Sequence, residues 1–190
     1  RPLTAKKTGM PGCSRRWTAA SGSSGGVVTD QPIIVRVAEL IARQAPAQLE
    51  ALGLGSCVAV ILHDPEARVG GLAHVLLPTA AVGERPDATP GRYAQSAVPA
   101  LLEAVLAAGA ARHRVVARLV GGATMFRNLT APGLIAIGER NTVAARRALD
   151  TLSLPLVAEA VGGDYGRTVR FDLEAGTVTV RSVRHGTLAL

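Results

Sequence analysis

Two apolar runs joined by a short polar turn constrain the fold of this chain more than any other feature. Residues 58–62 and 71–77 are apolar, and residues 63–68 between them read HDPEAR, with Asp and Pro where a type I turn favours them. This pattern predicts a β-hairpin. Because side chains alternate between the two faces of a strand, the hairpin also determines which residues can face one another.

The rest of the chain after residue 31 alternates short apolar runs with helical patterns. Apolar runs occur at residues 33–37 and 49–54, and strands are predicted at 115–120 and 156–160. A second hairpin is predicted from residues 167–173 and 177–183. Helices are predicted over residues 92–108 and 139–152, with Pro99 kinking or starting the first. The predicted fold class is α/β (α+β), with a mixed β-sheet layered with two or more helices.

Composition supports one globular domain, at residues 32–190. The 190 residues are 48% apolar and 18% charged, which excludes disordered, collagen-like and disulfide-rich classes. A chain of this length can bury a sizeable core without a metal or a disulfide. Residues 1–31 are rich in Gly, Ser, Thr, Lys and Arg and are predicted to be a disordered tail. We favour a dispensable leader over a charge-driven tether for this tail.

The net charge of +7 does not indicate nucleic-acid binding. Residues 1–30 carry +4 of it and the rest of the chain only +3, while aromatic residues make up 3% of the sequence. A platform of aromatic and basic side chains is therefore not expected. No apolar run approaches the roughly 20 residues that span a bilayer, and no signal-peptide core is evident. We expect a cytoplasmic protein, without membrane insertion, whose thiols are reduced.

The hairpin brings one thiol and one imidazole together as a candidate pair. If the turn is centred between Pro65 and Glu66, Cys57 lies directly opposite His74, with Cβ atoms roughly 4.5–5.5 Å apart. An imidazole at that distance can take the thiol proton and create a nucleophile for a carbonyl carbon. The alternative is structural, since a lone cysteine or histidine in an apolar strand is more often a core residue.

Glycine-rich turns are candidates for the rim of this site. The turn before the cysteine includes Gly55 and Ser56, and Gly121 and Gly122 follow a predicted strand. Their backbone N–H groups could stabilise an oxyanion or face a substrate, although sharp turns at strand ends explain the second pair equally well. Neither glycine cluster after residue 120 has phosphate-loop or dinucleotide-binding spacing.

A metal site is the other chemical interpretation of these residues. His63 would lie on the same face as Cys57, but six strand residues separate them by roughly 20 Å, which is too far for a shared metal. His113 and His185 have no ligand pattern around them and are interpreted as surface residues. We therefore expect no metal and no cofactor.

Several segments together resemble the CheD family of chemoreceptor glutamine deamidases, in the family's order. They are Gly53-Leu54-Gly55-Ser56-Cys57-Val58, the Asp64-Pro65 turn, residues 71–78, 91–94 and 121–126, Ile137-Gly138-Glu139-Arg140-Asn141, and residues 162–167. The resemblance extends from about residue 33 to 183. It implies that Cys57 is the nucleophile and His74 its base. The implied reaction hydrolyses glutamine side-chain amides on the cytoplasmic helices of chemoreceptors, and a CheC-type phosphatase is the implied second partner.

One position departs from the family pattern. The family's third catalytic residue is usually a threonine six residues before the cysteine, and that position is Ala51 here. A methyl group cannot hydrogen-bond, so the implied triad is incomplete. Ser56 is a poor substitute because adjacent strand residues face opposite sides. The alternative function is therefore a catalytically weakened adaptor that binds chemoreceptors or the CheC-type phosphatase.

Overall fold

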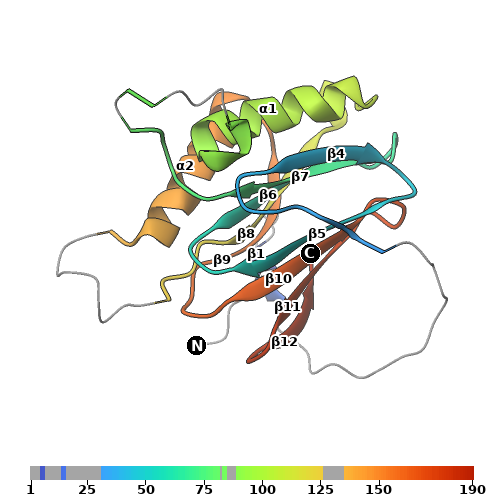
Figure 1. The fold of residues 1–190 in the computed structure, drawn as a ribbon. Helices are drawn as coiled ribbons and strands as arrows, with labels where there is room; N and C mark the ends of the chain where they lie inside the picture. The colour runs from blue at the N-terminus through green and yellow to red at the C-terminus, as the bar shows by residue number, and fades with distance from the viewer. Residues whose placement is uncertain (1–4, 7–13, 16–30, 82, 85–88, 126–134) are drawn as a thin grey trace.

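The fold consists of three layers, with two helices above one sheet and a second sheet below it (Figure 1). The computed structural model describes residues 5–6, 14–15, 31–81, 83–84, 89–125 and 135–190. Within these residues no helix is both long enough and apolar enough to cross a membrane. The α+β class, with helices layered on a mixed sheet, is confirmed, and the second sheet is an addition to it.

The first sheet, sheet A, forms the middle layer. Its strand order is β2-β1-β9-β8-β6-β7-β4, and only the β8–β9 pair is parallel. The strands are β1 (Ala5–Lys6), β2 (Ser14–Arg15), β4 (Leu40–Gln44), β6 (Val58–Asp64), β7 (Val69–Val75), β8 (Val116–Gly121) and β9 (Leu156–Val161). Strands β6 and β7 are buried on both faces, which explains why their sequences are continuously apolar rather than alternating.

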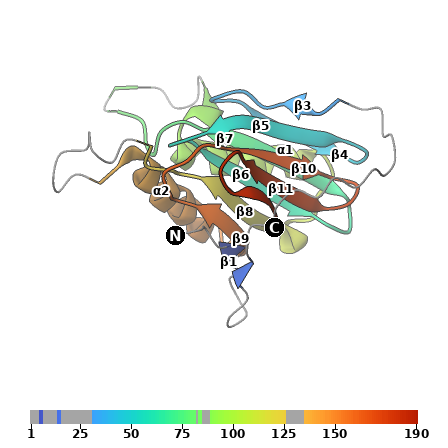
Figure 2. The same cartoon turned by 90° about the horizontal axis from the view of Figure 1, so that it is seen from below.

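The second sheet, sheet B, packs on the lower face of sheet A, and its strands are seen from below in Figure 2. Its order is β12-β11-β10-β5-β3, with a parallel β3–β5 pair. The strands are β3 (Ile33–Ile34), β5 (Gln48–Leu54), β10 (Arg167–Asp172), β11 (Thr177–Ser182) and β12 (Gly186–Ala189). The hairpin of β10 and β11 was predicted from the sequence; β4 and β12 were not.

Helices α1 (Ala94–Ala107) and α2 (Ile137–Thr151) cover the upper face of sheet A. Two short 3-10 helices, Pro90–Arg92 and Arg112–Arg114, flank α1 along the chain. α1 starts before Pro99, which lies inside it, so this proline does not mark the start of the helix. α1 buries residues at three- and four-residue spacing against the sheet, as expected for an amphipathic helix: Ala94, Ala97, Val98, Leu101, Leu102 and Val105.

Sheet A separates two hydrophobic cores. Val58, Val60 and Leu62 of β6 point to the helices. Ala59 and Ile61, between them, point to sheet B and pack with side chains such as Phe171. Each face of β6 thus supports a different layer, as the alternation of strand side chains requires.

The register of the central hairpin differs from the expected one. Val58 pairs with Val75 and Ala59 with His74, so Cys57 does not lie opposite His74. The turn comprises residues 65–68, one residue further along than predicted, and Arg68 adopts a positive φ of 50° there. Because the shift between partners is two residues, Cys57 and His74 remain on the same face of the hairpin.

A buried carboxylate fixes this turn. Asp64 is fully buried and accepts hydrogen bonds from the backbone N–H groups of Glu66 and Ala67, from that of Ala111 and from the Arg114 guanidinium. The Arg114 hydrogen bond is the largest cause that holds the Asp64 pKa far below its usual range. The sequence signal of Asp before Pro therefore marked the turn correctly, but the turn is centred one residue later than predicted.

Most of residues 1–31 lie outside the described part of the chain. The prediction of a disordered tail therefore stays a prediction. In the described part of this segment, Ala5–Lys6 form β1 and Ser14–Arg15 form β2. Strand β1 extends sheet A beyond β9, because Lys6 pairs with Glu159.

Candidate active site

The candidate nucleophile follows a tight turn between the two sheets. β5 of sheet B ends at Leu54, and β6 of sheet A begins at Val58, directly after Cys57. Gly53 has a φ of +65°, a conformation that L side chains rarely adopt, although a Cβ there would meet no atom within 4 Å. The glycine is thus required by backbone geometry, and it lets the chain turn from one sheet into the other.

Gly121, the last residue of β8, and Gly122, which follows it, lie against the backbone of the cysteine. The N–H of Gly122 donates to the carbonyl of Cys57 at 2.8 Å, and the N–H of Ala123 donates to that of Gly55 at 2.8 Å. A Cβ on Gly121 would lie 2.2 Å from the Cys57 carbonyl oxygen, so no side chain fits there. The Gly122 N–H therefore positions Cys57 and is already occupied, which removes it as a donor to an oxyanion.

Asn141 connects helix α2 to both strands of the central hairpin. Its side chain is fully buried, and its Nδ2 donates to the carbonyls of Ser56 and Leu76, each at 2.9 Å. Ser56 precedes Cys57, and Leu76 follows His74 by two residues. One amide group thus spans the open end of the hairpin, where the two candidate catalytic residues lie. Sequence reasoning missed this role, although Asn141 belongs to one of the segments that carried the family resemblance.

His74 is buried and its ring is oriented by a backbone carbonyl. Its Nδ1 lies 3.2 Å from the Val35 oxygen, and Nε2 is buried without a hydrogen-bond partner among the described residues. Because a carbonyl can only accept, Nδ1 carries the proton and Nε2 keeps a free lone pair. Burial lowers the His74 pKa below its ordinary value of 6.5, so the ring is neutral at neutral pH.

Cys57 faces the same inter-sheet core as His74. The half-buried side chain of Cys57 packs against the core between the sheets, which includes Ala59 and Leu72. Leu72 lies two residues before His74 in β7, so both side chains point to the same face of that strand. Since Ala59 is the direct partner of His74, Cys57 is its diagonal neighbour. Diagonal neighbours lie roughly 7–8 Å apart at Cα, within reach of long side chains.

The resting pair is uncharged. Burial raises the pKa of the Cys57 thiol above its ordinary value, and a hydrogen bond from its own backbone N–H opposes this only in part. With a neutral imidazole and a neutral thiol, proton transfer to His74 Nε2 must accompany attack on a substrate rather than precede it.

Ala51 lies in β5, opposite Val169 of β10, and is fully buried in the core between the sheets. Its methyl group offers no hydrogen bond to His74. The orienting bond to the ring instead comes from the backbone at Val35, which is held by its own N–H bond to the Glu50 carbonyl at 2.8 Å. The structure therefore supplies a partner for Nδ1 without a hydroxyl at position 51.

Two of the other histidines, His63 and His113, lie toward the turn of the central hairpin and away from this site. His63, at the far end of β6, is 3% exposed and packs edge-on against Phe171 at 5.1 Å between ring centroids. His113 is exposed, as expected for a surface residue, whereas His185 is half-buried and stacks on Tyr165 at 3.9 Å.

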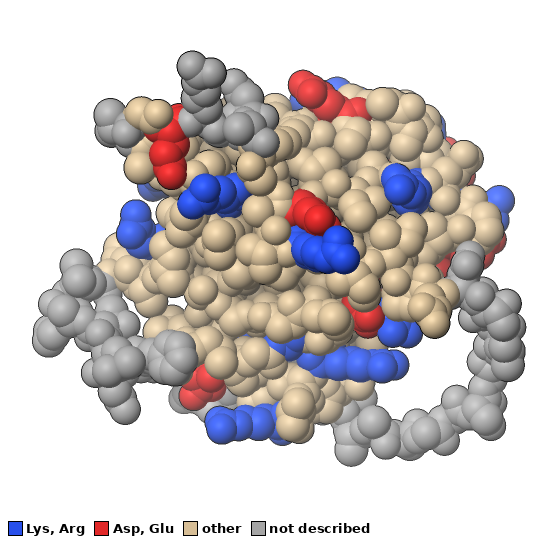
Figure 3. All heavy atoms as spheres, in the orientation of Figure 1, with Lys and Arg blue, Asp and Glu red and all other residues tan. Residues whose placement is uncertain are grey.

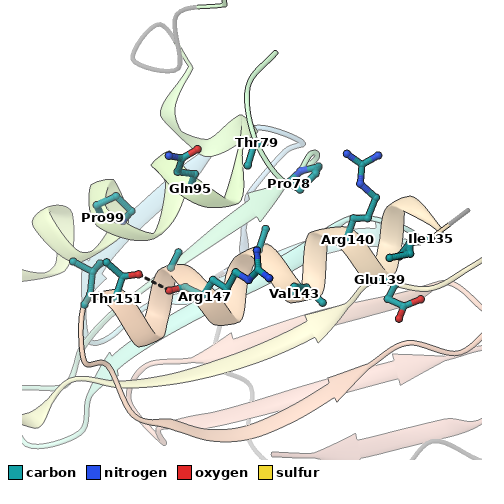
Figure 4. Close-up of a pocket in the computed structure, with 13 residues that line it drawn as sticks. Pro78, Thr79, Gln95, Pro99, Ile135, Glu139, Arg140, Val143, Arg147 and Thr151 are labelled. Carbon is teal, nitrogen blue, oxygen red and sulfur yellow. Dashed lines mark hydrogen bonds between the residues drawn. The ribbon is translucent and has the colours of Figure 1, made fainter. Parts of the chain in front are cut away.

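A groove of about 680 Å³ lies between helices α1 and α2 (Figure 4). Its walls include Pro99 of α1 and Val143 and Arg147 of α2. Neither Cys57 nor His74 lines it, because the groove lies on the helical side of sheet A and the pair faces sheet B. We assign it no part in the chemistry.

Comparison with known proteins identifies the family of this chain. Residues 76–182 match the family model "CheD chemotactic sensory transduction". "Chemoreceptor glutamine deamidase CheD" of Bacillus licheniformis is 36% identical, over 81% of this chain and 92% of the relative. The protein of that name from Halalkalibacterium halodurans is 38% identical, over 80% and 94%. A Desulfitobacterium hafniense protein named "Probable chemoreceptor glutamine deamidase CheD" is 41% identical, over 81% and 95%. The chain belongs to the CheD family.

Proposed function

We propose that this protein is a cysteine-dependent glutamine deamidase that acts on chemoreceptors in the cytoplasm. The name shared by the relatives gives the substrate class. The observation that carries the mechanism is the unpartnered, buried Nε2 of His74 on the same face as Cys57. The proposal makes Cys57 the nucleophile and His74 the general base, with no cofactor.

In the first half of the reaction, the thiol proton passes to His74 Nε2 while the sulfur attacks the side-chain amide carbon of a glutamine. The C–S bond forms, and the carbonyl oxygen becomes an oxyanion. His74 then returns the proton to the amide nitrogen, the C–N bond breaks, and ammonia leaves. The Val35 carbonyl stabilises the imidazolium formed in between, because it accepts from Nδ1.

In the second half, water attacks the thioester and gives its proton to Nε2. The C–S bond breaks, glutamate is released, and the sulfur recovers the proton from His74. Gly55 and Ser56 stay candidates for donating to the oxyanion, and Gly121 for lining the substrate rim.

The test is conversion of glutamine to glutamate in a chemoreceptor cytoplasmic fragment, followed by ammonia release and by peptide mass. We expect turnover by the natural chain, none by Cys57→Ala, and a loss of at least about a hundredfold for His74→Gln. His113→Gln, which changes an exposed histidine, should leave the rate unchanged. Turnover that survives in Cys57→Ala would overturn the assignment of the nucleophile.

A second candidate function is an adaptor that binds the receptor or a CheC-type phosphatase without efficient turnover. The observation that favours it is the buried methyl group of Ala51 in place of a hydroxyl. A natural chain that binds the receptor fragment but releases no ammonia would establish the adaptor and exclude the enzyme. The phosphatase is proposed as a partner in both cases, and co-elution of the two proteins tests it.

A further inference from the structure

A second pocket lies at the end of sheet B that carries the cysteine turn. Its volume is about 400 Å³, and it contains residues from that turn, from β10 and from the connection between β11 and β12. Its lining residues are Gly53, Met125, Asp164, Tyr165, Gly166, Arg167, Thr168, Arg181, Ser182, Val183 and Arg184. None of these is assigned a role in the proposed reaction.

The strand register places this pocket beside Cys57. Arg167 pairs with Leu54, three residues before Cys57, and Thr168 pairs with Arg181 of β11. β11 is two strands from β5, so at about 4.8 Å per strand Arg181 lies roughly 10 Å to the side of the cysteine turn. Met125 joins the two regions, since its side chain would be 3.3 Å from a Cβ placed on Gly55.

The pocket has an excess of positive charge that the protein does not neutralise. Arg181 and Arg184 are exposed, and no described carboxylate forms an ion pair with either. Arg167 is different, because its buried guanidinium donates to the carbonyls of Ala160, Gly162 and Tyr165. Asp164 is the one acid in the lining. On the face drawn in Figure 3, basic side chains also gather over the lower part, where sheet B lies.

Exposed apolar groups complete the pocket. Met125 is 43% exposed, and Val183 is fully exposed in the turn between β11 and β12, which also contains Arg184. An apolar surface flanked by unpaired guanidinium groups fits one face of an amphipathic helix that carries carboxylates.

We propose that Arg181 and Arg184 are specificity-determining residues that bind a carboxylate on the substrate helix, about two turns from the glutamine held at Cys57. The lateral offset of Arg181 from β5, the strand that leads to Cys57, sets the spacing, because seven helical residues span about 10.5 Å. Met125 and Val183 contact the apolar side chains between the two positions. This inference rests on the proposed function, since it takes a receptor helix as the substrate.

Binding tests the inference without turnover. The Kd of a chemoreceptor cytoplasmic fragment is measured for Cys57→Ala, with and without Arg181→Gln and Arg184→Gln. We expect the two further substitutions together to weaken binding by about tenfold at low salt and by much less at high salt. Arg147→Gln in the same background is the matched control, because it removes an exposed, unpaired arginine from α2. Equal affinity in all variants would overturn the inference.

Turnover separates this inference from the proposed function. If the natural chain deamidates the fragment, the double variant with Arg181→Gln and Arg184→Gln should have a KM about tenfold higher and nearly the same kcat. Iodoacetamide should alkylate Cys57 at the same rate in the double variant and in the natural chain. Replacing the receptor Glu by Gln, or Asp by Asn, seven residues from the target glutamine should remove the difference in KM between the natural chain and the double variant. An unchanged kcat/KM in the double variant refutes the role of the arginines and leaves the deamidase intact. A silent natural chain refutes the deamidase, while the binding measurement still decides the role of the arginines.

Discussion

At the scale of single residues, the site depends on a histidine that is kept neutral and in one tautomer. Burial keeps the ring neutral, and the Val35 carbonyl holds the proton on Nδ1, so that Nε2 keeps a free lone pair that can act as a base. A neutral thiol and a neutral base avoid placing an uncompensated charge between two sheets. In the proposed mechanism, the charge-separated pair forms only as the thiol attacks a substrate.

This arrangement predicts the pH dependence of the reaction. The base must be unprotonated, and its pKa lies below 6.5. We therefore expect kcat/KM to be constant through neutral pH and to fall with acid only below pH 6.5. The measurement is the pH profile of deamidation, with protein stability checked at each pH. An acid limb centred above pH 7 would show that a different group controls the reaction.

Position 51 gives a second prediction at this scale. Because Val35 already orients the ring, Ala51→Thr should change kcat by less than about threefold. Ala51→Val is the matched control, since it has nearly the same shape as threonine without the hydroxyl group. A rate that rises more than tenfold in Ala51→Thr and not in Ala51→Val would show that the missing hydroxyl limits this protein.

At the scale of secondary structure, helix α2 acts as a clamp on the central hairpin. Its Asn141 side chain bonds to the chain just before Cys57 and just after His74. The packing of α2 is close, since a Cβ on Gly138 would lie 2.4 Å from the Ala123 carbonyl oxygen. The position of the helix and the separation of Cys57 and His74 are therefore coupled.

Removing the clamp should affect chemistry as well as stability. Asn141→Ala leaves two backbone carbonyls without their donor, and we expect it to lower the free energy of unfolding by about 2 kcal/mol. It should also slow Cys57 alkylation and lower kcat more than it changes KM. Arg147→Gly provides the control, because it weakens the same helix by about 1 kcal/mol at an exposed position. If both variants retain full kcat, Asn141 is only structural.

Elements with strong patterns were predictable from sequence, and the interactions between them were not. The apolar periodicity of α1 and the apolar runs of β6 and β7 predicted those elements. Strand β4 contains Arg43 and Gln44 and is paired with β7 alone, so its sequence lacks a buried-strand pattern. The hairpin register was wrong because the turn is centred one residue later than predicted, with a positive φ at Arg68 that no residue type in the turn indicated. Cys57 and His74 were predicted to share a face of the hairpin, and they do. The role of Asn141 was not predicted, since one asparagine in a helix carries no signal of its two distant partners.

At the scale of the whole molecule, stability depends on the packing of the two sheets, and His63 lies in that interface. Burial, followed by the charge of Arg118, lowers the pKa of His63 from 6.5 to about 4. The unfolded chain therefore binds a proton between these two pH values that the folded protein does not bind. Stability is complete above pH 6.5 and falls as the pH approaches 4.

Urea unfolding at two pH values tests this link. Between pH 7.5 and pH 5 we expect His63 to account for a loss of about 2 kcal/mol, so His63→Gln should show a correspondingly smaller difference. Asp64 should not contribute in this range, because its pKa lies far below it. His113→Gln should behave like the natural chain. The same pH dependence in His63→Gln would refute the assignment.

The depth of the sulfur has a consequence for which amides can react. Cys57 is half-buried at the end of a two-sheet sandwich, so a reacting carbonyl must reach inward from the surface of its own protein. The main-chain carbonyls of a substrate helix accept hydrogen bonds within that helix, and they lie farther from the thiol than a side-chain amide by about the length of the side chain. Glutamine extends its amide about 1.5 Å beyond that of asparagine, by one carbon–carbon bond. If Cys57 is the nucleophile, as proposed, the partial burial of its side chain favours the longer of the two amides and disfavours attack on the peptide backbone of the target.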